Sequence, residues 1–369
     1  MKVFYYLNKN CRGRQADNAV YLPKSIKPIF YSKVNEEGAE SRQKTIYSYL
    51  YPLNPFLITI KDAKKNVDIA ADLIYTFGTF LKNTNIPYVI NVDNPVCFTY
   101  YSAIALYNPF VKYQINKYLK NEKLLKLFPI SMAAKKGLEN AYGDEIAEKI
   151  DVIYPPLPEI KFSKETDCPR FIFISYNFYI KGGREILNAL KRVRGKYRFT
   201  MFSNIPDGFL QLAKKMGVNI YKNIPRKILL NDIIPYHDVV VHPSYMDSFG
   251  MAPFECINAG LAGIGTDMYA IPEFIEHENN GFIIESPIKY FNDEFLPNLK
   301  YWILPNIEPY VKITKFENVE HELAEYIQYY IDNPSELKKH KKYSRKLHKE
   351  KFSLEIYQKK VESIFKKIL

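Results

Sequence analysis

The carboxylates of Asp247 and Glu255 lie eight positions apart, on either side of Gly250. A short β-branched run precedes them and an apolar helix pattern follows, so the turn should leave free backbone amides at a helix N-terminus. Those amides and the helix dipole favour an anion, and phosphate above all. We expect the phosphate site to be formed by the amides of Ser248, Phe249, Gly250, Met251 and Ala252.

Asp247 and Glu255 admit two interpretations. In the first, Asp247 only forms a turn and Glu255 only complements the helix dipole. In the second, both carboxylates accept hydrogen bonds from hydroxyl groups, one from a sugar and one from a ribose. Two such acceptors beside a phosphate site would make a nucleotide-sugar site.

The elements around this turn can be read from residues 238–260. The run DVVV predicts a strand that is buried on both faces. Pro253 suits the first position of a helix, and Gly260 suits the left-handed residue that ends one. The turn should therefore join the carboxyl end of a buried strand to a short helix.

The composition indicates a two-domain cytoplasmic protein. The chain has 369 residues, of which 47% are hydrophobic, and ordinary domain sizes predict two domains. No stretch reaches the length of a membrane span, and the first residues do not resemble a signal peptide. The four cysteines are far apart and lack metal-ligand spacing, so we expect reduced thiols and no metal site.

The formal charge of +12 is concentrated at the end of the chain, where residues 335–369 hold twelve Lys or Arg against four Glu. A solvated face of terminal helices explains this surplus most simply. Attraction to an anionic membrane is the second explanation. Nucleic-acid binding is the third, and we do not expect it, because the aromatic residues among these charges fit a core-facing stripe better.

Earlier in the chain, strand and helix patterns alternate in the manner of a parallel α/β sheet. The run PYVINVD ends in Asp93, which should lie at the carboxyl end of a strand, where open sheets bind ligands. The run RFIFIS is followed by a loop and by Lys181-Gly182-Gly183 at the start of a helix, a second place for an anion. Residues 98–124 predict one long helix, and residues 151–157 predict a strand stopped by paired prolines.

The stretch PSYMDSFGMAPFE resembles the donor-binding motif of family four of the retaining glycosyltransferases of the GT-B fold, also called glycosyl transferases group 1. That motif is an acidic residue, seven residues and then glutamate; Asp247 stands where the family usually has glutamate. Further matches follow in register at 262–264, 271–273 and 280–284. The resemblance implies an α/β protein with two facing Rossmann-like domains, each a doubly wound parallel sheet, and a C-terminal helix that crosses back to the first.

The resemblance also implies roles for single residues. Glu255 would bind the ribose and Asp247 the transferred sugar, while Lys181 matches a lysine that binds the donor diphosphate. The arginine that usually accompanies this lysine is absent, since Tyr176 or Asn177 stands in its place; either fewer charges hold the diphosphate, or Arg184 or an N-terminal arginine substitutes. Ile224 falls in the loop that contacts the base. Asp93 stands where the family commonly has a histidine beside the sugar, and it could instead be a turn residue.

By this resemblance the chain divides into an N-terminal acceptor domain of residues 1–157, joined by the final helix 352–369, a linker of residues 158–169, and a donor-binding domain of residues 170–351. Residues 286–316 exceed a normal connection and are expected to be an insertion.

The implied activity is a metal-independent, retaining hexosyl transfer from a nucleotide-diphosphate sugar, with no further cofactor. The acceptor would be a glycan, a lipid or a protein, and peripheral association with an anionic membrane is compatible with the basic terminus. A nucleotide-sugar-binding protein without transfer activity is the alternative, because Asp247 replaces glutamate and the first loop keeps only one glycine, Gly13. A dinucleotide oxidoreductase is disfavoured, since no glycine fingerprint follows the first strand.

Overall fold

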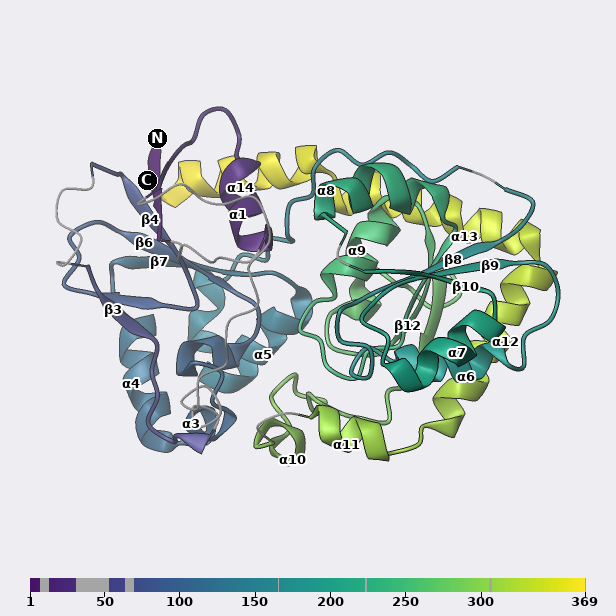
Figure 1. Cartoon of the computed structure of the whole chain (residues 1–369). Helices are drawn as coiled ribbons and strands as arrows, with labels where there is room; N and C mark the ends of the chain where they lie inside the picture. Colours follow the sequence, from purple (N-terminus) through teal and green to yellow (C-terminus); the bar gives the residue numbers. More distant parts are fainter. Residues whose placement is uncertain are drawn as a thin grey trace. The chain divides into compact units, whose positions relative to one another are not determined.

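The computed structural model describes residues 1–6, 13–30, 53–63, 70–164, 166–222, 224–304 and 307–368. The chain forms two compact units (Figure 1). Unit 1 comprises Met1–Pro158, Phe291–Pro305 and Leu354–Leu369, and unit 2 comprises Glu159–Tyr290 and Asn306–Ser353.

Unit 1 is built on a five-stranded parallel sheet in the order β2-β1-β4-β6-β7. Its strands β4 and β6, LIYTF and YVINV, are almost entirely buried, as expected of parallel strands covered on both faces. Strands β3 and β5 form a separate two-stranded parallel sheet. The bounds are β1 Lys2–Tyr5, β2 Lys27–Phe30, β3 Ile60–Asp62, β4 Leu73–Phe77, β5 Phe80–Lys82, β6 Tyr88–Val92 and β7 Leu124–Pro129.

The helices of unit 1 correct the prediction of one long helix over residues 98–124. Tyr100 and Tyr101 adopt left-handed backbone angles, with φ of 51° and 64°, and they end a 3-10 helix. The side chain of Ser102 then caps a second helix, and that of Asn108 caps a third before residue 124 enters β7. The bounds are α1 Gly13–Val20, η3 Pro95–Thr99, α3 Ala103–Tyr107, α4 Pro109–Leu119, α5 Met132–Tyr142 and η4 Asp144–Lys149.

The predicted strand at residues 151–157 is also absent from the described structure, although its start follows β7. The amides of Asp151 and Ile153 donate to the carbonyls of Leu127 and Pro129 at 3.0 and 2.9 Å. The next residues are Pro155 and Pro156, which have no N–H to continue such a ladder. Residues 151–158 therefore leave the sheet as irregular chain.

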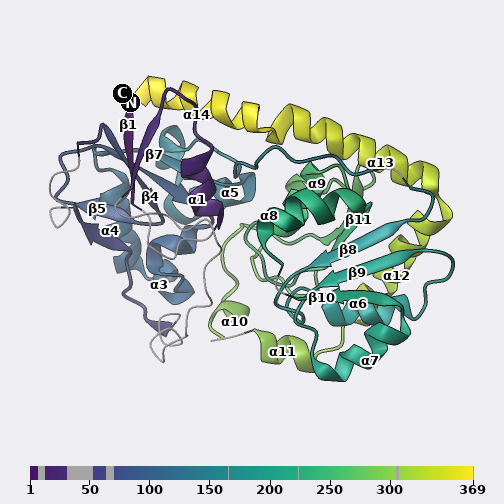
Figure 2. The same ribbon diagram turned by 45° about the horizontal axis from the view of Figure 1, so that its top comes forward.

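The terminal helix α14, Leu354–Ile368, belongs to unit 1, which confirms the predicted return of the chain to the first domain. Its apolar face packs into the core that contains Val3, Tyr5 and Phe128. The rings of Phe365 and Phe128 stack with their centroids 5.8 Å apart. The two chain ends accordingly lie close together in both views of this unit (Figures 1 and 2).

The segment predicted to be an insertion contributes to both units. Residues 291–305 belong to unit 1, where Pro297 accepts a 2.8 Å hydrogen bond from the Tyr107 hydroxyl and Trp302 is buried against Phe291. This part contains α10, Leu299–Trp302, and the next helix, α11, Glu308–Ile313, belongs to unit 2.

Unit 2 is built on a six-stranded parallel sheet in the order β10-β9-β8-β11-β12-β13, with helices on its faces (Figure 2). The chain proceeds outward from β8 to β10 and then returns to place β11 on the other side of β8. The strands are β8 Arg170–Ile174, β9 Arg198–Phe202, β10 Val218–Tyr221, β11 Val239–His242, β12 Ala262–Thr266 and β13 Gly281–Ile284. The main helices are α6 Gly183–Leu190, α7 Asp207–Lys215, α8 Arg226–Ile228, α9 Met251–Asn258, α12 Glu317–Asp332 and α13 Pro334–Leu347.

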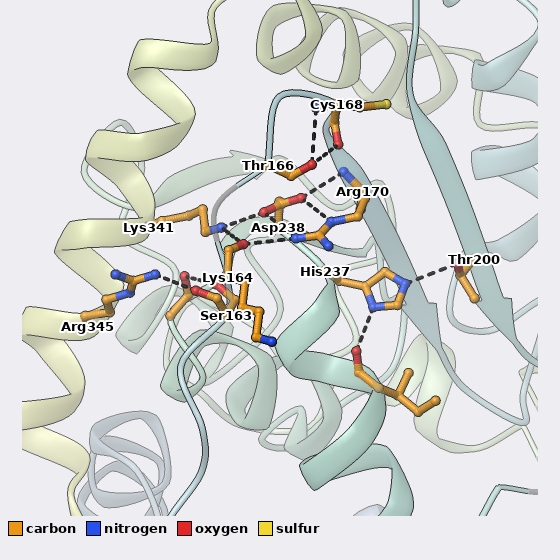
Figure 3. A network of polar contacts seen from close by, with 12 residues as sticks. Ser163, Lys164, Thr166, Cys168, Arg170, Thr200, His237, Asp238, Lys341 and Arg345 are labelled. Carbon is orange, nitrogen blue, oxygen red and sulfur yellow. Dashed lines mark hydrogen bonds and ion pairs between the residues drawn. The ribbon is translucent and has the colours of Figure 1, made fainter.

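A buried ion cluster closes the amino end of this sheet (Figure 3). Asp238, just before β11, accepts from Arg170 Nε at 2.9 Å and from Lys341 Nζ at 2.5 Å. Lys341 also donates to the Lys164 carbonyl, and Arg345 donates to the Ser163 carbonyl. The cluster therefore joins two strands, helix α13 and the chain that enters unit 2, at the opposite end of the strands from the site described next.

Candidate functional site

The carboxyl ends of β8 and β11 are neighbours in unit 2, because the two strands pair directly. The chain passes from β8 to β9 on one side and reaches β11 on the other, so this pair is the topological switch point of the sheet. Ligands of doubly wound sheets bind at such a point, outside the carboxyl ends of the strands. The predicted phosphate turn follows β11, and the Lys-Gly turn follows β8.

Close backbone contact holds these two loops together. Gly182 is left-handed, with φ of 74°, and a Cβ there would lie 2.5 Å from the carbonyl oxygen of Pro243. The amide of Tyr245 donates to the carbonyl of Ile180 at 2.9 Å. Only glycine fits at position 182, and its neighbour Lys181 is thereby directed at the loop after β11.

Lys181 and Asp247 form an ion pair across the two loops. Lys181 Nζ lies 2.7 Å from Asp247 Oδ2, and it also donates to Ser244 Oγ at 3.1 Å and to the carbonyl of Met246. An ammonium has three N–H groups, so these contacts use all of them. The structure thus brings two predicted site residues together, and a diphosphate could reach Lys181 only by replacing one of these partners.

His242, the last residue of β11, is a second partner of Asp247. Its Nε2 lies 3.1 Å from the same oxygen, Oδ2, and its ring is buried. Burial by itself raises the pKa of Asp247, but the Lys181 ammonium and the His242 hydrogen bond outweigh burial and hold that pKa well below its usual range. Burial lowers the pKa of His242, although Asp247 opposes this shift. Asp247 is therefore a carboxylate beside a neutral imidazole at neutral pH.

The phosphate turn has the geometry that the sequence predicts, with one displacement. Gly250 is left-handed, with φ of 85°, and it precedes α9, which begins without a side-chain cap. Pro253 is the third residue of the helix and not the first, so the first two residues, Met251 and Ala252, keep N–H groups outside the helical ladder. Gly260, with φ of 79°, follows the helix in the left-handed conformation, as predicted.

The five residues of the turn differ in what they can present to a ligand. The Phe249 side chain is buried, with its ring centroid 4.9 Å from that of Phe254 and 5.6 Å from that of Phe274, so only its backbone is available. Ser248, Met251 and Ala252 are half-buried. An anion at this turn would meet mainly backbone amides.

Glu255, in helix α9, pairs with Arg226, a residue that was not predicted to belong to the site. Both Nε and Nη2 of Arg226 lie 2.7 Å from Glu255 Oε1, and the carboxylate is buried. Arg226 is the first residue of α8, directly after the loop that holds Ile224, which is half-buried. The available signal was a basic residue beside the loop expected to contact the base, but no local pattern pairs it with a carboxylate 29 positions later.

We expect Glu255→Ala to weaken binding of a free nucleoside diphosphate, because it removes a charged acceptor for ribose hydroxyls, at a cost of about 1.5–3 kcal/mol. Isothermal titration calorimetry measures this change. Glu255→Gln keeps the shape of the side chain and serves as the control for packing. If Glu255→Ala binds the nucleoside diphosphate as tightly as the wild type, Glu255 does not bind the ribose.

Arg184, one candidate for the missing arginine near the Lys-Gly turn, bonds to other residues of unit 2. Its guanidinium pairs with Glu185 and donates to the carbonyls of Lys312 and Thr314 at 2.9 and 2.6 Å. Burial raises the pKa of Glu185, and Arg184 partly opposes that rise. Tyr176, at the expected place of the arginine, is largely exposed. Of the N-terminal arginines, Arg12 lies outside the described residues, as does the side chain of Arg14.

Asp93 follows β6 directly, at the carboxyl end of the unit 1 sheet. It is buried and accepts the Tyr101 hydroxyl at 3.0 Å through Oδ2. The neighbouring Asn94 caps the 3-10 helix that follows, with its side chain accepting the amide of Val96 at 3.0 Å. Asn94 therefore forms the turn. The expected position of Asp93 beside the transferred sugar stays a prediction.

Part of the chain matches the model of a known protein family. Residues 161–297 fit the family model described as glycosyl transferases group 1. This segment is a group 1 glycosyltransferase domain. It spans β8 to β13, with the Lys-Gly turn and both motif carboxylates, and the resemblance stated above is confirmed. No curated protein matches the chain in sequence.

Solved structures share the fold of the whole chain, which is the GT-B fold. A glycosyltransferase from Rickettsia africae ESF-5 has 16% identity and a TM-score of 0.64, with 100% of this chain and 98% of that chain covered. Anabaena Alr3699/HepE in complex with UDP-glucose has 14% identity and a TM-score of 0.63, with 99% of each chain covered. Sucrose-phosphate synthase from Thermosynechococcus elongatus has 12% identity and a TM-score of 0.63, with 100% and 98% covered.

The part of the chain that the structure describes shows neither a metal cluster nor a membrane-spanning helix. They contain no group of three or more His, Cys, Asp or Glu side chains arranged to hold a metal ion. Among them no helix combines the length and the apolar character needed to cross a bilayer.

Proposed function

We propose that this protein is a retaining glycosyltransferase that moves a hexose from a nucleoside diphosphate sugar to a glycan, lipid or protein acceptor. The observation that carries the proposal is the position of Asp247 and Glu255 on either side of the Gly250 turn at the switch point of unit 2. The turn offers amides to a diphosphate, Glu255 an acceptor to a ribose, and Asp247 an acceptor to a sugar. UDP and UDP-glucose bound to the Anabaena protein make UDP-sugars the first donors to test.

The proposed mechanism stabilises the departing diphosphate and needs no protein nucleophile. The amides at the start of α9 would face the charge that develops on the leaving group, and the Lys181 ammonium would join them by exchanging one of its three protein partners for a diphosphate oxygen. Retention would follow from attack on the face that the diphosphate leaves, with a diphosphate oxygen taking the proton of the acceptor hydroxyl.

The proposal predicts turnover without a divalent cation, because amides and Lys181 replace the metal that other glycosyltransferases place on the diphosphate. The purified protein is incubated with a panel of UDP-, GDP- and ADP-sugars and candidate acceptors, with and without EDTA. We expect nucleoside diphosphate release in both conditions and an α-linked product from an α-linked donor, seen by NMR. Loss in EDTA that is restored by added metal would reject this mechanism.

The alternative is a nucleotide-sugar-binding protein that has no transfer activity. One observation favours it, namely that Lys181 is occupied by three partners within the protein. The same panel separates the two functions. Binding of a nucleoside diphosphate sugar without release of the nucleotide, for every acceptor extract tested, would establish the alternative.

A peripheral association with anionic membrane is proposed as a secondary property of a cytoplasmic enzyme. The structure reduces the charge that is available for it, because Lys341 and Arg345 bond inside unit 2 and Lys359 and Lys366 each pair with a glutamate on α14. Such an association would be salt-sensitive. Flotation with anionic and neutral vesicles at low and high salt measures it.

A further inference from the structure

His242 occupies a position that the proposed chemistry does not yet use. It is the last residue of β11 and stands five positions before Asp247. Its ring is fully enclosed in unit 2, and its Nδ1 is a buried atom without a hydrogen-bond partner among the described residues. Among the described residues, the ring makes one polar contact, at 3.1 Å from Nε2 to Asp247 Oδ2.

The direction of this hydrogen bond follows from chemistry. Asp247 is ionised, and a carboxylate can only accept. Nε2 must therefore carry the proton and donate it, which leaves Nδ1 as the bare acceptor of a neutral imidazole.

Both donors to Asp247 reach the same oxygen. Lys181 Nζ and His242 Nε2 lie 2.7 and 3.1 Å from Oδ2. Two donors from different strand ends fix the plane of a short side chain, and they leave Oδ1 as the oxygen that can accept a sugar hydroxyl. Asp247 is one methylene shorter than the glutamate usual in the motif, so its orientation matters more.

The two donors would respond differently to a bound donor substrate. Lys181 has no spare N–H, and a diphosphate would compete directly with Asp247 for it. His242 is neutral and enclosed, so a diphosphate neither attracts it strongly nor reaches it.

We infer that His242 is a positioning residue, which holds Asp247 toward the donor sugar when the diphosphate draws Lys181 away. This inference rests on the proposed function of the site, since it assigns a role to a residue behind the sugar-binding carboxylate. It also explains why a polar side chain ends an otherwise apolar strand, VVVH.

The test compares three variants with the wild type. His242→Phe keeps an aromatic ring and removes the donor, His242→Gln places an amide N–H near the position of Nε2, and His242→Asn is too short to do so. Calorimetry gives the dissociation constants of UDP and of the UDP-sugar that the wild type prefers, and kinetics give kcat/KM for transfer.

We expect His242→Phe to bind UDP within about twofold of the wild type and to lose about ten- to a hundredfold in kcat/KM, the range of a hydrogen bond to a charged group. Its affinity for the UDP-sugar should fall more than its affinity for UDP. His242→Gln should recover most of both properties and His242→Asn should not, and this pair decides the matter if the Phe variant does not fold.

Wild-type transfer in His242→Phe, equal activity of the Gln and Asn variants, or an equal loss of UDP and UDP-sugar affinity would each overturn the inference. The last result would mean a structural role only. Failure of the proposed function gives a different result, because the wild type itself would then transfer no sugar, while the binding comparison among the variants still reports on Asp247.

Discussion

Replacing Asp247 with alanine should reduce sugar transfer by about a hundredfold or more, while UDP alone binds as tightly as to the wild type or more tightly. The first effect follows because a charged acceptor of sugar hydroxyls is removed, and two bonds of this kind are together worth about 3 kcal/mol or more. The second follows because Lys181, no longer held 2.7 Å from Oδ2, becomes available to the diphosphate. Calorimetry with UDP and a transfer assay measure the two effects.

Two further variants of Asp247 serve as controls. Asp247→Asn keeps the shape and one acceptor but removes the charge, so it should release Lys181 and retain part of the transfer. Asp247→Glu restores the residue usual in the motif and should remain the most active of the three. A loss of UDP affinity in Asp247→Ala equal to that in Glu255→Ala would contradict the separate roles of the two carboxylates.

The parts of the site that the sequence predicted are formed by residues that lie close together in the chain. Gly250 and Gly260 have the left-handed angles that their places around a short helix require. The Lys-Gly turn and the motif carboxylates were located from local patterns, because each lies beside a strand whose apolar run is unmistakable. Parallel order then places the ends of β8 and β11 together.

The residues that the sequence missed are partners across long separations. Arg226 reaches Glu255 from 29 positions away, and the cluster around Asp238 joins residues about 70 and 103 positions apart. No periodicity or spacing rule links such pairs. His242 was not predicted for another reason. A single polar residue after an apolar run is the usual sign that a strand ends, and it does not by itself indicate a site residue.

The errors in secondary structure have local physical causes. Tyr100 and Tyr101 end the predicted long helix by adopting left-handed angles that are uncommon for aromatic residues. A local sequence pattern gives no sign of this, because the hydrogen bonds of the two residues lie outside it. The Tyr100 amide donates to Thr59 Oγ1, 41 positions earlier, and the Tyr101 hydroxyl donates to Asp93.

Replacing Asp238 with alanine should lower the free energy of unfolding of the protein by about 3–5 kcal/mol, the usual cost of breaking a buried ion pair from one side. The loss would leave Arg170 and the buried Lys341 facing each other without an anion (Figure 3). Burial already lowers the pKa of Lys341, and Asp238 is the group that opposes this shift. Without Asp238, the folded variant should lose the Lys341 proton more readily than the wild type does. The destabilisation should therefore become smaller as the pH rises above neutrality.

Thermal and urea unfolding at pH 7 and pH 9 measure this effect. Glu355→Ala breaks a pair of similar length on α14, Lys359 to Glu355 at 2.6 Å, in which both side chains are more than 70% exposed. This control should leave the unfolding midpoint unchanged, because exposed pairs contribute little. A loss in Asp238→Ala no larger than in the control would show that the cluster is not an ionic unit. Because Asp238 lies at the amino end of β11 and Asp247 beyond its carboxyl end, UDP affinity of the folded variant should stay at the wild-type value.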